Sequence, residues 1–382
     1  MNDETSLMFA SQGEEASRMN EAEFNRILIM CSEAGASDIT FQTDECVKAE
    51  VHGRFHSVTR RRLDNTELQT VINMIYGSNA STEIKCGRDV DTAYSFKIDR
   101  TKNYRFRVNA TGGEVMGNDG MQITVRTIPG VPPKMEDLSV EQAIIDNFVP
   151  KQGLVLVTGA TGSGKSTLLS ANIRSILENP DSHKKIVTYE SPIEFVYADV
   201  IKPSSTIFQT EIPRHLPSFA DGIRNALRRA PKIILLGEAR DADTIERSVE
   251  AAVTGHLVYT TVHSSGVAET VQRMAVTFPG QERMSRTIDI VESLRMVVSQ
   301  QLVTRVDGKG RVALREFLVF DSELRERLVK NDDLSRMVTQ IRDMVREYGQ
   351  TMETSARRYF DDDLISARDY ELVAAKSKAI GV

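Results

Sequence analysis

Residues 159–167 read GATGSGKST, and this short stretch decides the fold of the chain. It matches the pattern Gly-x-x-x-x-Gly-Lys-Ser/Thr, whose glycines let backbone N–H groups converge on a phosphate. An apolar run, GLVLVT, precedes the stretch and LLSANIRSILEN follows it closely, as expected for a buried strand and a helix. Because a helix N-terminus carries a positive partial charge, the sequence predicts a loop that binds the phosphates of a nucleotide.

The cofactors predicted from this loop are ATP and Mg²⁺. Lys165 is expected to reach the β- and γ-phosphate oxygens, and the Ser166 hydroxyl is expected to ligate magnesium. The rest of the predicted nucleotide site is made of neighbouring loop residues, namely Gly159, Ala160, Thr161, Gly162, Ser163, Gly164 and Thr167.

Acidic residues follow two further apolar runs. TYESPIEF carries Glu190 and Glu194, and IILLGEARD carries Glu238. Ligands of an open α/β sheet collect at the carboxyl ends of its strands, so we expect these acids near the γ-phosphate. There they would hold the waters of Mg²⁺ and orient the attacking water. A single glutamate of this kind is better explained as a solvated loop carboxylate, but acids at successive strand ends favour a site.

Two histidines, His256 and His263, bracket the apolar run LVYTTV. A lone histidine is usually structural, and these two lie too far apart in the sequence to share one metal ion. Both are candidates for sensing the γ-phosphate or a neighbouring subunit.

The chain is predicted to have four segments. Residues 1–20 are polar and expected to be mobile, and residues 21–133 have the pattern of an α+β domain that ends in a proline-rich hinge, TIPGVPPK. Residues 134–322 contain apolar runs separated by helical stretches, as in a parallel sheet covered by helices. Residues 323–382 are helical by period, with one apolar stripe made of Leu334, Met337, Val338, Ile341, Met344 and Val345.

Arginines alternate with apolar residues in the α+β domain. In YRFRVNA and ITVR, this alternation places Arg105, Arg107 and Arg126 on the polar face of half-buried strands. A solvated strand face is the alternative to a functional role for them.

Composition excludes several classes of protein. The net charge of −6 argues against nucleic acid as the main ligand. The three cysteines, Cys31, Cys46 and Cys86, lie far apart and are predicted to be buried, reduced thiols without a metal site. The N-terminus is no secretory signal, and no apolar run approaches the roughly 18 residues of a membrane span. These features predict a soluble cytoplasmic protein that reaches membranes only through partners.

The motifs together resemble a family, the secretion and pilus-motor ATPases of type IV pili, type II secretion and type IV secretion. GATGSGKST resembles their Walker A motif, YESPIEF their aspartate box, IILLGEARD their Walker B motif and TGHLVYTTVHS their histidine box. RFRVNA and VRTIP resemble the arginine-bearing hairpin of the family's N-terminal domain. The chain has no tetracysteine insert, and in this it resembles the retraction motors of the family. The length and the helical C-terminal extension resemble the DotB/TraJ-type ATPases of type IVB secretion and conjugation.

This resemblance implies a RecA-like P-loop ATPase core with a smaller, PAS-like α+β N-terminal domain and C-terminal helices. It also implies a homohexameric ring recruited to the inner membrane by secretion-complex proteins. Glu194 would be the base that activates water, Glu190 and Glu238 would support Mg²⁺, and Arg107 and Arg126 would be delivered to a nucleotide site.

The chain departs from the family pattern at a few positions. Ser191 stands where the aspartate box usually has aspartate, and Ala230 and Lys232 stand where the family tends to have acids. The core chemistry remains possible with these residues.

Three further functions remain alternatives to a motor for type IVB secretion or conjugation. The first is a type IV pilus retraction motor. A RecA-like nucleic-acid motor is the second, but it requires a basic face and aromatic stacking platforms, whereas only 6% of the residues are aromatic. A small-molecule kinase is the third, and it would leave the histidine box and the arginine-bearing domain without a role.

Overall fold

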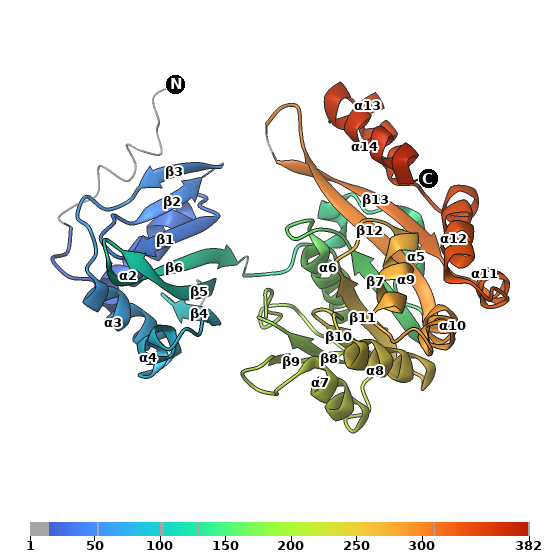
Figure 1. Cartoon of the computed structure of the whole chain (residues 1–382), viewed down its shortest axis with the longest axis horizontal. Coiled ribbons are helices and arrows are strands. Elements are labelled where there is room, and N and C mark those ends of the chain that lie inside the picture. Colours follow the sequence, from blue (N-terminus) through green and yellow to red (C-terminus); the bar gives the residue numbers. More distant parts are fainter. Residues whose placement is uncertain (1–14, 52, 100–102, 129, 309, 381–382) are drawn as a thin grey trace. The chain divides into compact units, whose positions relative to one another are not determined.

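The computed structural model describes residues 15–51, 53–99, 103–128, 130–308 and 310–380. For residues 378–380 it describes the backbone alone. The chain divides into two compact units, Met1–Gly130 and Val131–Val382, and the division falls within the proline-rich stretch (Figure 1). Each unit has its own sheet and its own apolar core.

The first unit is a six-stranded sheet in the order β3-β2-β1-β6-β5-β4, with every described pairing antiparallel. Helix α2 begins after Asn20, whose side chain accepts a hydrogen bond from the Glu23 backbone and caps it. Phe24 and Phe41 are fully buried in the core between helix and sheet. The elements are α2 (Glu21–Glu33), β1 (Asp38–Gln42), β2 (Lys48–Val51), β3 (Arg54–Ser57), α3 (Asn65–Tyr76), α4 (Ala80–Lys85), β4 (Val90–Lys97), β5 (Asn103–Val115) and β6 (Asn118–Ile128). The predicted α+β pattern is therefore confirmed.

Residues 15–20, the last part of the predicted mobile tail, make hydrogen bonds to the rest of the first unit. The Glu15 carboxylate accepts hydrogen bonds from the backbone N–H groups of Arg60 and Arg61. Met19 is buried, and its N–H donates to Glu67 Oε1 at 2.6 Å. Long-range hydrogen bonds therefore hold residues 15–20, which the sequence had assigned to the mobile tail. Residues 1–14 of the predicted tail lie outside the described part of the chain.

The second unit is built on a seven-stranded sheet in the order β13-β12-β7-β11-β10-β8-β9. Each described pairing is parallel except that of β12 with β13. The strands are β7 (Gly153–Thr158), β8 (Lys185–Glu190), β9 (Thr206–Glu211), β10 (Ile233–Leu236), β11 (Leu257–Val262), β12 (Leu294–Thr304) and β13 (Arg311–Val319). The predicted parallel sheet is confirmed. Strands β12 and β13 follow one another in the chain and form an antiparallel hairpin.

Helices cover both faces of this sheet. Side chains of β7 alternate between two apolar clusters, because successive residues of a strand point to opposite faces. One cluster is shared with the short helices before β7 and with the helix after it, η1 (Met135–Leu138), α5 (Gln142–Asn147) and α6 (Lys165–Glu178). The other cluster lies under α7 (Phe219–Leu227), α8 (Ala242–Val253), α9 (Val267–Val276) and α10 (Arg283–Ser293).

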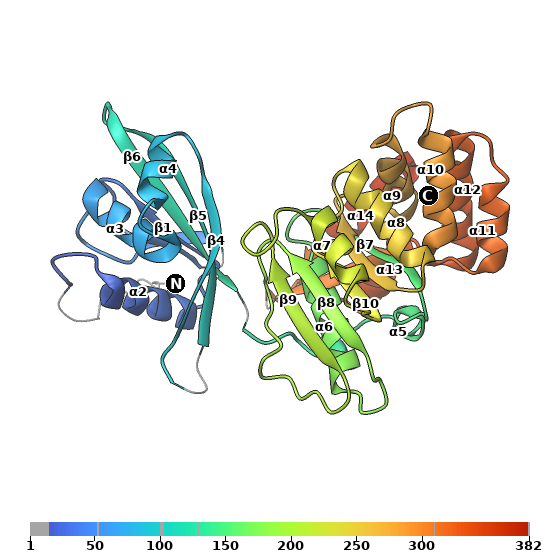
Figure 2. The same ribbon diagram turned by 90° about the horizontal axis from the view of Figure 1, so that it is seen from below.

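The C-terminal helices belong to the second unit. They are α11 (Ser322–Val329), α12 (Leu334–Tyr348), α13 (Met352–Asp361) and α14 (Ala367–Ile380). The predicted stripe of α12 is buried from Met337 to Val345 and joins the core cluster of the sheet, while Leu334 is only partly buried. Helices α11 and α12 lie at the opposite side of the unit from the edge strand β9 in both views (Figures 1 and 2).

The cysteines are not uniformly buried. Cys31 is buried in the first unit, where burial raises the pKa of its thiol to about 12. Cys46 is half-buried and Cys86 is exposed, so the prediction of burial was wrong for Cys86, which follows the short surface helix α4. In the described part of the chain, no helix is both long and apolar enough to cross a membrane.

Candidate nucleotide site

The phosphate loop, residues 159–167, connects the fully buried strand β7 to α6. Gly159 and Gly164 both have positive φ, +146° and +83°, in a backbone region that residues with side chains rarely adopt. A Cβ at Gly159 would collide with the Gln300 carbonyl oxygen, and one at Gly164 would lie 2.8 Å from Gln300 Nε2. The two glycines thus allow strand β12 to pass directly against the loop.

The loop has the properties of a phosphate site. The first backbone N–H groups of α6 have no acceptors within the helix, as at every helix N-terminus. The Ser163 hydroxyl is buried without a hydrogen-bond partner in the described structure. Lys165 Nζ donates to the carbonyl oxygens of Gly159 at 2.9 Å and Ala160 at 2.8 Å, so its charge lies inside the loop. The residues present therefore fit a nucleotide phosphate.

Two glutamates act on this lysine. Burial lowers the pKa of Lys165, and the negative charges of Glu194 and Glu238 oppose that shift. Glu194 follows β8 and Glu238 follows β10, and the carboxyl ends of these parallel strands meet at one edge of the sheet. Both acids therefore lie where the sequence predicted them, close to the phosphate loop.

Glu238 has two further neighbours. Its Oε2 lies 2.6 Å from Arg240 Nε and 3.8 Å from His263 Nε2. Burial, followed by the positive charge of Lys165, lowers the pKa of His263 below its ordinary value of 6.5. This histidine is therefore mostly neutral at pH 7, and its ring can donate one hydrogen bond and accept another.

Glu190 has a different environment from the other two acids. Its Oε1 accepts hydrogen bonds from Thr188 Oγ1 at 2.5 Å and Gln209 Nε2 at 3.1 Å, which link the ends of β8 and β9. Its predicted part in Mg²⁺ binding remains a prediction. Within the described residues, no group of three His, Cys, Asp or Glu side chains is placed to hold a metal. Mg²⁺ that accompanies a nucleotide is usually held by phosphates, water and one or two protein oxygens, and Ser166 fits that role.

His256 lies at the end of its strand that is away from the phosphate loop, which bears only on its predicted contact with the γ-phosphate. It precedes β11, whereas the phosphate loop follows the carboxyl end of the parallel neighbour β7. At about 3.3 Å per residue, the seven steps from His256 to His263 span about 23 Å. Its Nδ1 instead lies 3.1 Å from the Ala251 carbonyl oxygen. A role for His256 as a γ-phosphate sensor at this chain's own loop is therefore excluded.

The arginines of the first unit lie on neighbouring strands. Arg107 of β5 and Arg126 of β6 are direct cross-strand partners. Arg107 Nη2 lies 2.6 Å from Asp91 Oδ2, and Arg126 Nε lies 2.8 Å from Asp38 Oδ1. Arg105 is buried, whereas the side chains of Arg107 and Arg126 are partly exposed. The period of two assigns side chains to a face of the sheet, but what covers that face depends on the rest of the fold.

Two supporting residues were not predicted from the sequence. Glu211 is buried at the end of β9 and accepts a hydrogen bond from the Ile193 N–H at 3.3 Å, which supports the loop that carries Glu194. Gln300 is buried in β12 and donates from Nε2 to the Ser163 carbonyl oxygen at 2.6 Å. Its only signal in the sequence is an amide within the apolar run MVVSQQLV.

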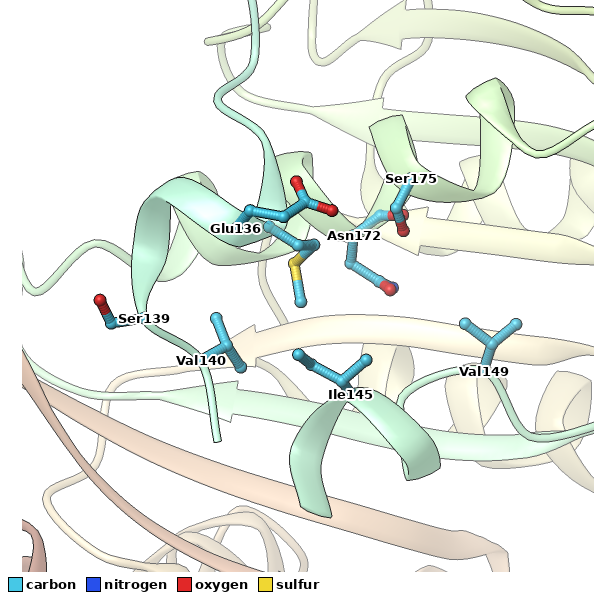
Figure 3. A pocket seen from close by; sticks show the side chains of 8 residues that line it. Glu136, Ser139, Val140, Ile145, Val149, Asn172 and Ser175 are labelled. Carbon is cyan, nitrogen blue, oxygen red and sulfur yellow. The ribbon is translucent and has the colours of Figure 1, made fainter. Parts of the chain in front are cut away.

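A cavity of about 250 Å³ lies between α6 and the segment that forms η1 and α5 (Figure 3). Asn172 of α6 and Ile145 of α5 reach toward each other across it. Its lining residues are Met135, Glu136, Ser139, Val140, Ile145, Val149, Asn172 and Ser175.

The sheet and the loop together have the fold of RecA-like P-loop ATPases. The family model described as "Type II/IV secretion system protein" matches residues 14–309, and the chain belongs to this family. The family predicted from the four motifs is therefore confirmed.

Three proteins illustrate the similarity. The X-ray structure of the ATPase DotB from Legionella pneumophila is 50% identical, covers 95% of this chain and 98% of its own, and has a TM-score of 0.83. The "Twitching motility protein" of Neisseria gonorrhoeae is 36% identical over 330 residues, which are 86% of this chain and 82% of that protein. The crystal structure of the pilus retraction motor PilT with bound ADP is 27% identical, covers 91% of this chain and 96% of its own, and has a TM-score of 0.77.

Proposed function

We propose that this chain hydrolyses ATP to power a type IVB secretion or conjugation apparatus, as one subunit of a homohexameric ring. The observation that carries the proposal is Lys165, whose ammonium is buried in the phosphate loop within the field of Glu194 and Glu238. An ammonium in this position is suited to the β- and γ-phosphates of a nucleotide. The 50% identity to a DotB ATPase over 95% of the chain supports this branch of the family.

Glu194 is the proposed general base. Glu238 already pairs with Arg240, and Glu190 already accepts hydrogen bonds from Thr188 and Gln209. A carboxylate that is engaged in this way is a poorer proton acceptor than one whose lone pairs remain available for water. Mg²⁺, when bound, neutralises charge on the phosphates, and Ser166 would hold it, with Glu238 and Glu190 acting through water.

Arg107 and Arg126 are the proposed arginine fingers. Both side chains project from a unit that has no phosphate loop, and both are partly exposed and paired with aspartates. Arg107 holds Asp91 in a bidentate pair through Nε and Nη2, whereas Arg126 contacts Asp38 through Nε. A guanidinium can bind phosphate oxygens with the same bidentate geometry as a carboxylate. On this proposal the ring is cytoplasmic, and secretion-complex proteins recruit it to the inner membrane.

A type IV pilus retraction motor is the second candidate, and the similarity to the PilT structure favours it. Its enzyme chemistry would be the same, so the two differ only in the membrane partner. A RecA-like nucleic-acid motor is less well supported, because the chain has a net charge of −6. If the chain is a secretion or pilus motor, single-stranded DNA should leave the rate of ATP hydrolysis unchanged.

The test is ATP hydrolysis by the full chain across a dilution series, measured together with sedimentation. If arginines complete the site between subunits, turnover per chain should rise with concentration as hexamers form, and it should be lost in dilute samples. Full activity in a demonstrably monomeric sample would contradict the ring model. Absence of hydrolysis in hexameric samples with Mg²⁺ would contradict the ATPase itself.

A further inference from the structure

Arg315 of β13 is a buried cation with no part in the proposed chemistry. Its side chain is only 1% exposed. A guanidinium remains charged in a protein, so its burial is unfavourable unless its N–H groups are hydrogen-bonded. Arg315 Nε donates to Gln300 Oε1 at 2.8 Å, Nη1 to Glu141 Oε2 at 3.1 Å, and Nη2 to the Leu138 carbonyl oxygen at 3.0 Å. Nη1 also donates to the Ser139 carbonyl oxygen at 3.1 Å, and these hydrogen bonds together indicate a fixed side chain.

Through Gln300, this network reaches the phosphate loop. The Gln300 Oε1 accepts from the guanidinium, so Nε2 must face the other way and donates to the Ser163 carbonyl oxygen at 2.6 Å. The same Nε2 fills the space beside Gly164 that a side chain would otherwise occupy. Arg315 therefore determines the orientation of the amide that contacts the loop.

On its other side, the network reaches the C-terminal helices. The Glu141 Oε1 accepts from Gln350 Nε2 at 3.2 Å and from Arg358 Nη2 at 3.4 Å. The backbone of Arg315 is bound as well, since its N–H donates to Ser355 Oγ at 3.0 Å and its carbonyl oxygen accepts from Gln350 at 2.9 Å. Gln350, which precedes α13, and Ser355 and Arg358 within it thus support one buried cation that contacts the loop through a single amide.

We infer that Arg315 is a positioning residue for nucleotide binding, and that α13 supports the phosphate loop through it. The inference rests on the proposed function to the extent that the loop binds ATP. Because the Ser163 carbonyl is fixed, the backbone of the loop is already ordered before phosphate binds. ATP binding therefore does not lose free energy to the ordering of the loop. The same contacts give the C-terminal extension a role within the nucleotide site.

The test is Arg315→Lys, which keeps the charge but cannot form the planar fork of hydrogen bonds. We expect the KM and the Kd for ATP to rise by about tenfold, the effect of roughly one hydrogen bond. We expect kcat at saturating ATP to stay within about twofold, because bound nucleotide itself orders the loop. Without nucleotide, hydrogen exchange at residues 159–167 should become faster.

The matched control is Arg342→Lys. Arg342 also joins a C-terminal helix to the core, with Nη2 2.8 Å from Glu269 Oε1, but it has no link to Gln300. The Arg342→Lys substitution should lower the melting temperature and leave the KM for ATP and the hydrogen exchange of the loop unchanged. If Arg315→Lys does not fold, Gln350→Met at the half-buried end of the network should give the same pattern with a smaller rise in KM.

Faster exchange of the loop in Arg315→Lys or Gln350→Met, but not in the control, supports the inference even if the wild-type chain fails to bind ATP. Failure of the wild-type chain to bind ATP would contradict only the proposed function. Equal loop exchange in the variant, the control and the wild type, with an unchanged KM, would overturn the inference.

Discussion

Lys165 must change partners during the proposed reaction. Two backbone carbonyl oxygens hold its ammonium, and burial lowers its pKa. Phosphate oxygens carry formal negative charge and bind an ammonium more strongly than carbonyls do, so nucleotide is expected to draw the side chain from the loop backbone toward the β- and γ-phosphates. The negative charges of Glu194 and Glu238 already act on the same ammonium.

Glu194→Gln should separate binding from chemistry. The amide has the shape of the carboxylate but cannot accept the proton of water, so turnover should fall by about a hundred- to ten-thousand-fold. ATP affinity and ring assembly should be retained. A larger loss of turnover in Glu190→Gln than in Glu194→Gln would show that the base is misassigned.

Lys165→Ala, measured in the same assays, should lose tight ATP binding, because the loop loses its cation.

At the scale of the elements, ion pairs and caps fix segments whose sequences are polar. Helix α3 begins with a capping box, in which Asp64 accepts from the Glu67 N–H and Glu67 Oε2 accepts from the Asp64 N–H at 3.0 Å. Glu67 also pairs with Arg61 Nη2 at 2.7 Å and accepts from the Met19 N–H. A single buried carboxylate therefore joins α3 to the segment that precedes α2.

Glu67→Gln should destabilise the first unit in a pH-dependent way. Although burial opposes it, the bonds from Arg61 and the two backbone N–H groups lower the pKa of Glu67 below its ordinary value of 4.5. A lowered pKa contributes stability above the unfolded value, and this contribution is lost as pH falls through the folded value. We expect a loss of about 1–2 kcal/mol at pH 7, and a smaller difference from wild type at pH 4.

The measurement is thermal or urea unfolding of the full chain at both pH values. Glu114→Gln is the control, because Glu114 is an exposed residue of β5 in the same unit. A constant difference between Glu67→Gln and wild type from pH 7 to pH 4 would mean that the carboxylate charge contributes nothing.

At the scale of the whole molecule, the chain distributes its candidate groups over two units. The phosphate loop and the three acids lie in the second unit, and the arginine pair lies in the first. A proline-rich segment connects the units, and Arg174 of α6 donates to the carbonyl of Pro132. The downstream end of the connection is therefore attached to the helix that begins at the phosphate loop.

Arg107→Ala and Arg126→Ala should impair turnover selectively. Arginine fingers contribute roughly a thousand- to a hundred-thousand-fold in other NTPases, so we expect large losses of kcat with near-normal folding, hexamer formation and ATP affinity. Arg54→Ala, on an exposed position of β3 in the same sheet, is the control and should retain full activity. Normal turnover in both finger variants would show that the ion pairs with Asp91 and Asp38 are only structural.

The sequence by itself determined the features that depend on neighbouring residues. The phosphate loop, the apolar parallel strands and the stripe of α12 follow from local spacing, because glycine conformation and burial of one face are properties of a short segment. The placement of Glu194 and Glu238 near Lys165 followed from one further rule, that carboxyl ends of parallel strands share an edge.

Only the tertiary structure decided which distant side chains meet. The strand order places β12 beside β7, and this brings Gln300 under the loop and Arg315 between Gln300 and Glu141, which are far apart in sequence. It also separates His256 from His263 by the length of β11 and buries Arg105. Hydrogen bonds and burial of this kind depend on strand register and packing across the sheet, and no local pattern of residues contains that information.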